Sequence, residues 1–213
     1  MSAIITFDQD NFIPVCEVLA AMDADLAQVI NTYGYPPFWH RPATFETLIH
    51  IILEQQVSLA SARAALIKLQ GKIETITPVN LMLLTDEELR QCYFSRQKTI
   101  YARHLATVIL SGKLNLDALP LMENSTVRTS LLQVKGIGNW TVDVYLMMVL
   151  QRADIFPLGD LALINSIKEV KHLPGSITKN EIANISSAWQ PWQTIASFIL
   201  WHAYLCKRKR NEY

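Results

Sequence analysis

Hydrophobic residues recur at helical spacing along nearly the whole chain. Apolar positions three and four residues apart lie on one face of an α-helix, so this pattern predicts amphipathic helices that pack on a shared core. Alternation of apolar and polar residues, which is typical of a β-strand, is confined to residues 4–7. The pattern therefore predicts an all-α fold.

Turn and cap residues divide the pattern into separate helices. We expect the first helix over residues 12–33, ended by Gly34 and the two prolines that follow it closely. Ser58 is a suitable N-cap, and Thr85 with Glu88 has the spacing of a capping box, so both places mark helix starts. Further helices are expected after Thr44, from Ser95 to Ser111, and over residues 126–134, 140–151, 161–171, 178–189 and 192–206.

Composition places the chain among ordinary globular proteins. It has 213 residues, half of them apolar, and neither repeats nor low-complexity linkers. Its 19 basic and 19 acidic residues cancel, which excludes a strongly basic nucleic-acid-binding domain, so any contact with DNA must be local. The widely separated Cys16, Cys92 and Cys206 favour reduced thiols over a disulfide framework and exclude a four-cysteine iron–sulfur cluster.

The sequence gives no indication of secretion or membrane insertion. Its first residues lack the basic and long apolar regions of a signal peptide, so we expect an intracellular protein. The most apolar stretch, residues 192–205, is shorter than the roughly 20 residues of a membrane-spanning helix and contains Gln193 and His202. We expect this stretch to be a core helix, and the basic run Lys207–Arg210 to be either a phosphate contact or a solvated tail.

A glycine-rich turn joins two of the expected helices. Within residues 132–141, Gly136 and Gly138 are separated by one residue. Glycine tolerates a positive φ and the close approach of another backbone, so such a turn can aim several amides outward at the start of the next helix. Free amides and the positive end of the helix dipole bind phosphate without a lysine. The alternative is an ordinary helix–helix corner in which Gly136 ends the first helix.

An aspartate follows this turn along the chain, at the start of another expected helix. Asp160 comes directly after a segment that contains Pro157 and Gly159, two residues that restrict or shape the backbone leading to it. Taken by itself, an aspartate in this place is most simply a helix N-cap. Taken with the hairpin, it has a second interpretation.

The hairpin and the following aspartate together resemble the helix-hairpin-helix (HhH-GPD) superfamily of DNA base-excision glycosylases. Residues 45–58, a helix that ends in a Gln-Gln-Val-Ser turn, are similar to the 3-methyladenine DNA glycosylase II branch. Residues 191–196 and Trp201 are similar to the C-terminal helix of the same branch. The resemblance covers residues 40–205, so we interpret the motifs as parts of one functional unit.

The resemblance implies a two-lobed helical fold without the β-rich N-terminal domain that some members add. One lobe is expected over residues 41–150, with the hairpin at 132–145, and the other from residues 1–40 and 151–206, followed by the basic tail 207–213. A monomer that binds double-stranded DNA with a damaged base is also implied. Such a protein would act at the nucleoid in a bacterial cytoplasm or in the nucleus of a eukaryote.

The resemblance assigns Asp160 as the catalytic carboxylate and Trp140 and Trp201 as aromatic walls of the base pocket. Aromatic faces attract a cationic alkylated base. Family members that also cut the strand carry a lysine after the position of Asn139, where it forms a Schiff base with the sugar. Because Trp140 stands there, the resemblance implies hydrolysis of alkylated purines of the 3-methyladenine and 7-methylguanine type without strand cleavage. Core packing is the alternative role for Trp140.

The resemblance also assigns the groups that hold DNA. Gln56, with Gln55 beside it, is implied as the wedge that fills the gap left by an extruded base, whereas a polar turn between helices is the simpler interpretation. The implied phosphate contacts are Lys135, Gly136, Ile137, Gly138 and Thr141. A Na⁺ or K⁺ ion is implied on the main-chain carbonyls of Leu132, Val134 and Ile137, and no other cofactor is required.

Several positions depart from the family pattern. Lys135 stands where proline is common, Tyr93–Phe94 replaces a Gly-Leu pair, and Gln193 replaces a frequent arginine. Val144 and Leu161 occupy positions that can be aromatic. The shape of the base pocket, and with it the substrate range, is therefore open.

Three other functions are compatible with the sequence. The same fold can serve the excision of another lesion, such as a deaminated or mismatched base. A catalytically silent protein can use the hairpin only to bind DNA, although Asp160 argues against it, and a helical scaffold without a DNA role is the third. His50 and His104 lack metal-ligand partners at a recognisable spacing, so we expect both to be structural.

Overall fold

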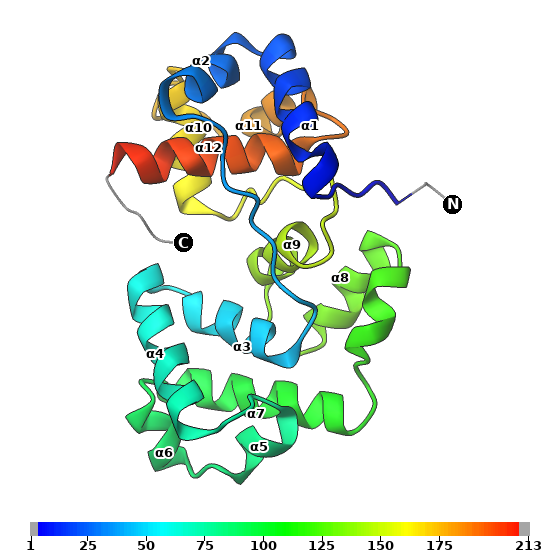
Figure 1. Cartoon of the computed structure of the whole chain (residues 1–213), viewed down its shortest axis with the longest axis vertical. Coiled ribbons are helices and arrows are strands. Elements are labelled where there is room, and N and C mark those ends of the chain that lie inside the picture. Colours follow the sequence, from blue (N-terminus) through cyan, green and yellow to red (C-terminus); the bar gives the residue numbers. More distant parts are fainter. Residues whose placement is uncertain (1–3, 209–213) are drawn as a thin grey trace. The chain divides into compact units, whose positions relative to one another are not determined.

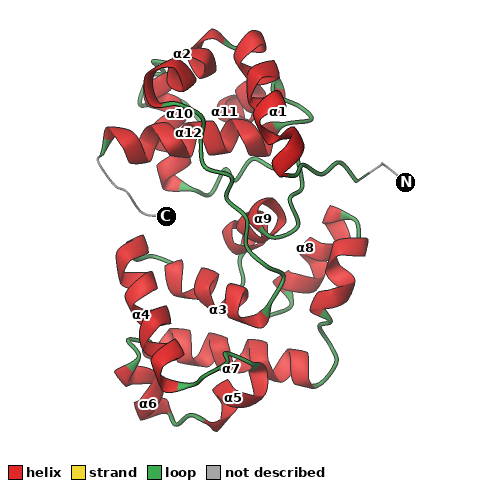
Figure 2. Ribbon diagram, in the orientation of Figure 1, coloured by secondary structure: helices red, strands yellow, loops and turns green. Residues whose placement is uncertain are grey.

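The computed structural model describes residues 4–208, and its regular structure is helical (Figure 1, Figure 2). The helices are α1 Gln9–Met22, α2 Ala24–Tyr33, α3 Phe45–Glu54, α4 Leu59–Lys72, α5 Pro78–Leu83, α6 Asp86–Gln91, α7 Arg96–Leu110, a 3₁₀ helix Leu116–Leu121, α8 Asn124–Leu132, α9 Asn139–Met148, α10 Leu161–Val170, α11 Lys179–Ser187 and α12 Gln193–Lys207. Residues 4–208 form no β-strand, only an isolated bridge between Thr6 and Arg152. The prediction of an all-α fold is confirmed. None of the described helices is long and apolar enough to cross a membrane.

The chain divides into two compact units. One contains residues 41–145, which we call the hairpin unit. The other contains the residues up to 40 together with those from 146 onward, which we call the aspartate unit. The resemblance implied a second boundary at about residue 150, and the boundary between the units follows residue 145, inside α9. The hairpin and the candidate aspartate therefore belong to different units.

Helix α3 is the centre of the hairpin unit, where it packs on α4 and α7, while α5 and α6 pack on α7. Thr44 caps α3 by accepting the Thr47 amide, so the predicted helix start is confirmed. Most residues of α3 are buried, including Glu54. Arg41 donates two hydrogen bonds to the Glu54 carboxylate, at 2.7 and 2.9 Å, which compensates the buried charge. Burial and this ion pair fix the helix end that precedes the Gln-Gln turn.

Helix α12 is the centre of the aspartate unit, where it packs on α10, α2 and α1 (Figure 1). The Ser166 hydroxyl of α10 donates to the Leu200 carbonyl at 2.5 Å, which joins the two helices. Ring contacts around Phe198 complete the core, and they involve Phe7, Phe12, Trp39 and Trp201. The apolar stretch at residues 192–205 is confirmed as a core helix.

The prediction of one long first helix is wrong. Residues 12–33 belong to two helices, α1 and α2, which are separated at Asp23. The Asp23 backbone is extended (φ −140°, ψ 107°), and its side chain caps α2 by accepting the amides of Asp25 and Leu26. The apolar spacing continues across the break and conceals it. An aspartate suited to an N-cap was the signal in the sequence.

The predicted caps at Ser58, Thr85 and Ser95 are confirmed, because each hydroxyl accepts the backbone amide three residues further on. The hydrophobic pattern does not predict α5, because a helix of six residues is too short to establish a period. Its start nevertheless follows the rules for helix N-termini, with Thr77 as the cap and Pro78 as the first residue.

Asp23 also joins α2 to the C-terminal part of the aspartate unit. Its carboxylate accepts hydrogen bonds of 2.8 Å from the Trp189 indole and from the Lys171 ammonium. Burial by itself would raise the pKa of Asp23, but the hydrogen bonds and charge of these partners outweigh burial and bring the pKa below its usual value. The ionised carboxylate therefore stabilises the fold.

We expect Asp23→Asn to lower the free energy of unfolding by about 1–3 kcal/mol at neutral pH, because asparagine keeps the cap but loses the charge opposite Lys171. A folded-state pKa below the unfolded one contributes stability that is present above the unfolded pKa and is lost as the pH falls through the folded pKa. The difference between wild type and variant should therefore shrink in acid. Urea unfolding at neutral pH and near the carboxylate pKa measures this difference.

Asp25→Asn is the matched control for this variant. The Asp25 side chain is 45% exposed and also pairs with Lys171, at 2.9 Å. Exposed ion pairs contribute little, so we expect a loss below about 1 kcal/mol. Equal losses for the two variants would contradict the central role of Asp23.

Candidate functional site

Asp160 is fixed at the start of α10 by the turns that precede it. The Asp160 amide donates to the Pro157 carbonyl, and the Leu158 amide donates to the Phe156 carbonyl, both at 2.9 Å. The Asp160 side-chain Oδ1 accepts the Leu163 amide at 2.7 Å. The prediction that Asp160 is a helix N-cap is confirmed, and the cap holds the carboxylate in one orientation.

A second donor reaches the same carboxylate oxygen. The Trp201 indole Nε1 of α12 donates to Asp160 Oδ1 at 3.1 Å. This indole is 8% exposed, stacks on Phe198 with ring centroids 5.9 Å apart, and meets Trp39 in an edge contact at 6.2 Å. Aromatic packing therefore aims the indole N–H at the aspartate. The sequence shows no sign of this bond, because the two residues lie 41 positions apart.

The hairpin turn between α8 and α9 requires glycine at position 136. The Ile137 amide donates to the Val134 carbonyl at 3.0 Å, so Lys135 and Gly136 are the central residues of a β-turn. Gly136 has a φ of +93°, which residues with a side chain rarely adopt. A Cβ at this position would lie 2.1 Å from Cγ of Tyr101. Backbone geometry and the neighbouring ring therefore both exclude a side chain.

Two polar side chains hold the turn in place. The His104 Nδ1 of α7 accepts the Lys135 amide at 3.0 Å, which gives this histidine the structural role expected from the sequence. Gln55, the C-cap of α3, donates its Nε2 to the Gly136 carbonyl at 2.8 Å and to the Thr141 hydroxyl at 3.0 Å. These bonds join the Gln-Gln turn to the hairpin within one unit.

The two glutamines of the turn after α3 differ in their surroundings. Gln55 is half-buried and bound to the hairpin, whereas Gln56 is exposed and has a φ of +57°. A non-glycine residue held at positive φ is uncommon and strained, and such strain is often found at functional sites. The Lys98 ammonium of α7 donates to the Leu53 carbonyl at 2.6 Å and so satisfies the end of α3. Burial lowers the pKa of Lys98. Gln56 thus projects from a firmly held turn.

The five implied phosphate contacts differ in exposure. Lys135 and Gly138 are exposed, Gly136 is half-buried, and Ile137 and Thr141 are buried. The amides of Lys135 and Ile137 already donate within the protein. The Lys135 side chain and the backbone at Gly138 face the solvent. Gly138 lies directly before the N-terminus of α9, which is the electropositive end of this helix.

An ion pair that sequence analysis missed joins the two helices of the hairpin. Arg128 of α8 donates to the Asp143 carboxylate of α9 and, at 3.1 Å, to the Asn139 side chain. Burial raises the pKa of Asp143, against the lowering effect of the Arg128 charge. Trp140, the second residue of α9, is half-buried on this helix.

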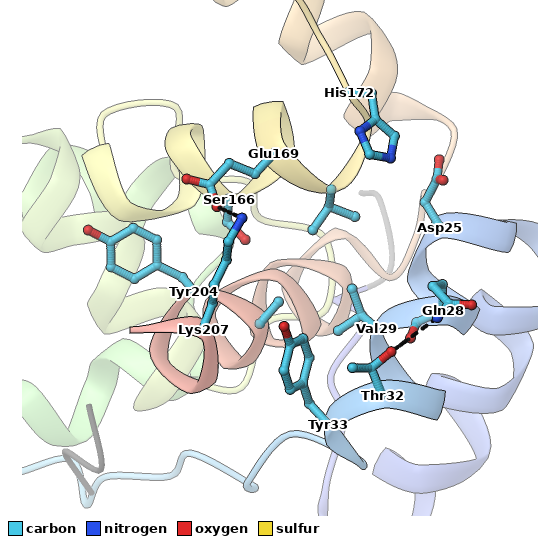
Figure 3. A pocket seen from close by; sticks show the side chains of 12 residues that line it. Asp25, Gln28, Val29, Thr32, Tyr33, Ser166, Glu169, His172, Tyr204 and Lys207 are labelled. Carbon is cyan, nitrogen blue, oxygen red and sulfur yellow. Dashed lines mark hydrogen bonds and ion pairs between the residues drawn. The ribbon is translucent and has the colours of Figure 1, made fainter. Parts of the chain in front are cut away.

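The aspartate unit contains a cavity of about 240 Å³ that Asp160 does not line (Figure 3). The cavity lies between α2, α10 and α12, and Glu169 at its edge pairs with Lys207 at 2.9 Å and with Arg208 at 2.7 Å. Half of the basic run is thus engaged with a carboxylate, and residues 209–213 of the tail lie outside the described residues. No cluster of His, Cys, Asp or Glu within residues 4–208 is arranged to hold a metal ion.

Comparison with known proteins places these residues in a family context. A profile described as "HhH-GPD superfamily base excision DNA repair protein" matches residues 49–191, which include the Gln-Gln turn, the hairpin and Asp160. A DNA-3-methyladenine glycosylase of Bacillus subtilis is 32% identical over 172 residues, which make up 75% of this chain and 57% of that protein. The chain therefore spans little more than half the length of this relative.

Two solved structures illustrate a similarity that extends along nearly the whole of this chain. The 3-methyladenine DNA glycosylase Mag1 of Schizosaccharomyces pombe, in complex with abasic DNA, has a TM-score of 0.83 and 26% identity, over 94% of this chain and 98% of that one. The DNA-3-methyladenine glycosidase of Bacillus halodurans has a TM-score of 0.75 and 29% identity, over 98% and 95% of the two chains. Both likenesses extend over the hairpin unit and the aspartate unit.

We expect Gly136→Ala to lower the free energy of unfolding by about 2–4 kcal/mol, because a methyl group would clash with the Tyr101 ring at an unfavourable φ. The matched control is Gly138→Ala, whose Cβ would meet no atom within 4 Å and whose φ is not positive, so a loss below about 1 kcal/mol is expected. Urea unfolding of both variants provides the comparison. Similar losses would show that the ring does not constrain the turn.

Proposed function

Because the chain belongs to the HhH-GPD superfamily of base excision DNA repair proteins, we propose that it is a monofunctional DNA glycosylase for alkylated purines. It hydrolyses the N-glycosidic bond of bases of the 3-methyladenine and 7-methylguanine type and leaves an abasic site. The observation that carries this proposal is the Asp160 carboxylate, held at the start of α10 by the Leu163 amide and the Trp201 indole. The names of the similar proteins support the substrate class.

One carboxylate suffices for this reaction. Cleavage of an N-glycosidic bond builds positive charge on the sugar, and a fixed carboxylate near that carbon stabilises the transition state. Asp160 supplies this charge and orients the attacking water. A purine methylated at N3 or N7 already carries positive charge and leaves as a neutral base, so its departure needs no general acid.

The hairpin unit holds the DNA. The exposed Lys135 side chain and the chain at Gly138, before the positive end of α9, bind a backbone phosphate. The target base must leave the duplex before a protein carboxylate reaches its sugar, and this costs least for weakly paired, damaged bases. Gln56 fills the gap in the helix, a role supported by its exposure and its positive φ. Gln55 positions that turn against the hairpin.

Trp140 accounts for the proposed absence of strand cleavage. A Schiff base with the sugar requires an amine, and an indole cannot form one. We assign to Trp140 the stacking contact with the cationic base, because this residue is half-buried and retains exposed surface. We also assign Trp201 to base binding, and its N–H fixes the orientation of Asp160.

The hairpin turn fits a monovalent cation. Main-chain carbonyls are suitable ligands for Na⁺ and K⁺, and the implied ligands are the carbonyls of Leu132, Val134 and Ile137. The Val134 carbonyl accepts one hydrogen bond, from the Ile137 amide, and keeps a second lone pair for an ion. A bound cation would supply positive charge beside a DNA phosphate.

The partner and compartment follow from the proposed reaction. We infer a monomer that acts on double-stranded DNA containing a damaged base. In a bacterium this DNA is the nucleoid in the cytoplasm, and in a eukaryote it is in the nucleus. The structural similarity to a glycosylase solved with abasic DNA supports the duplex as the ligand.

Asp160→Asn should slow the release of methylpurine by at least about a hundredfold, because the variant lacks the negative charge that stabilises the sugar cation. Asparagine also caps helices, so folding and DNA affinity should be kept. The measurement is single-turnover release of free base from methylated duplex DNA, with affinity for an abasic duplex measured in parallel. Undiminished release by this variant would contradict the assignment.

Two further comparisons sharpen this experiment. Trp201→Phe keeps the aromatic packing and removes only the N–H donor, so we expect a smaller loss, on the order of tenfold. Alkali added after the reaction converts abasic sites into strand breaks. Strand breaks that form before alkali is added would contradict the monofunctional reaction.

Gln56→Gly should slow excision from fully paired duplex by about tenfold, because base extrusion loses its wedge. Glycine accepts the positive φ, so the turn itself should be kept. Gln56→Asn is the matched control, since asparagine tolerates the same backbone conformation and retains a shorter amide. A lesion placed opposite a mismatch is already weakly paired, and its excision should depend less on Gln56. Equal effects on paired and mismatched substrates would count against the wedge.

A further inference from the structure

The turn between α8 and α9 has a lysine at a position that favours proline. The Ile137 amide donates to the Val134 carbonyl at 3.0 Å, so Lys135 and Gly136 are the second and third residues of a β-turn. The φ of Gly136 is +93°, and that of Lys135 is not positive, which defines a type II turn. Proline suits the second position because its ring fixes φ and it has no N–H to satisfy. A lysine has neither property.

His104 of α7 supplies a restraint that the lysine lacks. Its Nδ1 accepts the Lys135 amide at 3.0 Å. Because Lys135 is exposed, water could satisfy the same amide, but a mobile water molecule would not fix the position of the turn. The bond to His104 therefore does more than satisfy a donor, because it attaches the second residue of the turn to a long helix of the hairpin unit.

Helix α7 also contacts the next residue of the turn. Tyr101 and His104 are three residues apart, so they lie on the same face of α7. The Tyr101 ring occupies the space of a Cβ at Gly136, and the Gly136 carbonyl accepts from Gln55. The backbone of the turn is thus held by α7 and by the end of α3, while the Lys135 side chain remains exposed.

We propose that His104 is a positioning residue for DNA binding, and that its Nδ1 takes the place of a proline ring at position 135. This inference rests on the proposed glycosylase function. The hydrogen bond fixes the backbone at Lys135, so this position combines a held turn with an ammonium group, which proline does not offer. The held backbone directs the ammonium to a DNA phosphate, and His104 acts only through Lys135.

The experiment measures affinity for a duplex with a tetrahydrofuran abasic analogue over a range of salt concentrations. His104→Ala removes the acceptor, and alanine favours helices, so α7 should be kept. The variant is made in the wild type and in Lys135→Pro. Packing lost with the imidazole is the same in both backgrounds, whereas the acceptor matters only where residue 135 has an N–H. His104→Asn is the matched control, because its Oδ1, like the Nδ1 of histidine, is bonded to Cγ.

In the wild-type background, His104→Ala should bind at least about threefold more weakly at low salt. The slope of log affinity against log salt should become shallower by up to about 0.9, the value of one phosphate contact. His104→Asn should restore most of the affinity and the slope. Lys135→Pro loses the same contact, so adding His104→Ala to it should change the slope no further. A merely structural role would lower stability in both backgrounds and leave the slope unchanged.

Thermal unfolding checks that each variant is folded, and His104→Leu, which keeps more of the packing, replaces His104→Ala if it is not. Equal losses of affinity in the two backgrounds, or a slope that His104→Ala does not alter, would overturn the proposal. If the wild type then still releases methylpurine, the glycosylase function stands and only the role of His104 fails. Failure of the wild type both to bind the abasic duplex and to release base would reject the function as well.

Discussion

The hydrogen bonds of Gln55 to the Gly136 carbonyl and the Thr141 hydroxyl are the constraint on which the functional surface of the hairpin unit depends. Gln55 is the C-cap of α3, a helix whose residues are mostly buried. Its side-chain amide therefore fixes the hairpin turn relative to the core of the hairpin unit. The Tyr101 ring occupies the space that a Cβ at position 136 would need. Glycine at this position therefore allows the turn to lie against the ring while its carbonyl accepts the hydrogen bond from Gln55. The turn that carries Gln56 and the hairpin turn proposed to bind phosphate are therefore one rigid arrangement, and a shift in either is transmitted to the other.

A chain without net charge must bind a polyanion through local features. Many of its basic side chains are engaged with carboxylates, as in the pairs Lys72–Glu88, Arg103–Asp86, Arg128–Asp143, Lys171–Asp23 and Lys207–Glu169. Such pairs add little positive field outside the protein. The start of α9 offers backbone amides and a helix dipole instead, and Lys135 adds one exposed charge there. This explains how a DNA-binding surface can coexist with a neutral composition.

The sequence predicted what is encoded locally. Helix starts at Thr44, Ser58 and Thr85 follow from a hydroxyl that caps the amide three residues on, and each is confirmed. The break at Asp23 was missed because the apolar spacing runs through it, although the cap residue was legible. The N-cap role of Asp160 was likewise legible from the residues around it.

The contacts that orient the site are not encoded locally. Trp201 donates to Asp160 from 41 positions away, and Gln55 reaches Gly136 across 81 positions. No periodicity or spacing reports such pairs, because the packing of whole helices brings them together. A family resemblance marks such residues as important but does not say which atoms meet.

The geometry at Asp160 explains why charge alone would not suffice for the proposed catalytic role. The Leu163 amide and the Trp201 indole both donate to the same oxygen, Oδ1, at 2.7 and 3.1 Å. A glutamate would carry the same charge, but its additional methylene would move that oxygen away from both donors. It would also lose the short reach that lets aspartate cap the helix. For the proposed reaction the length of the side chain therefore matters as well as its charge, because stabilisation of the transition state depends on a carboxylate that is already fixed before the sugar cation forms.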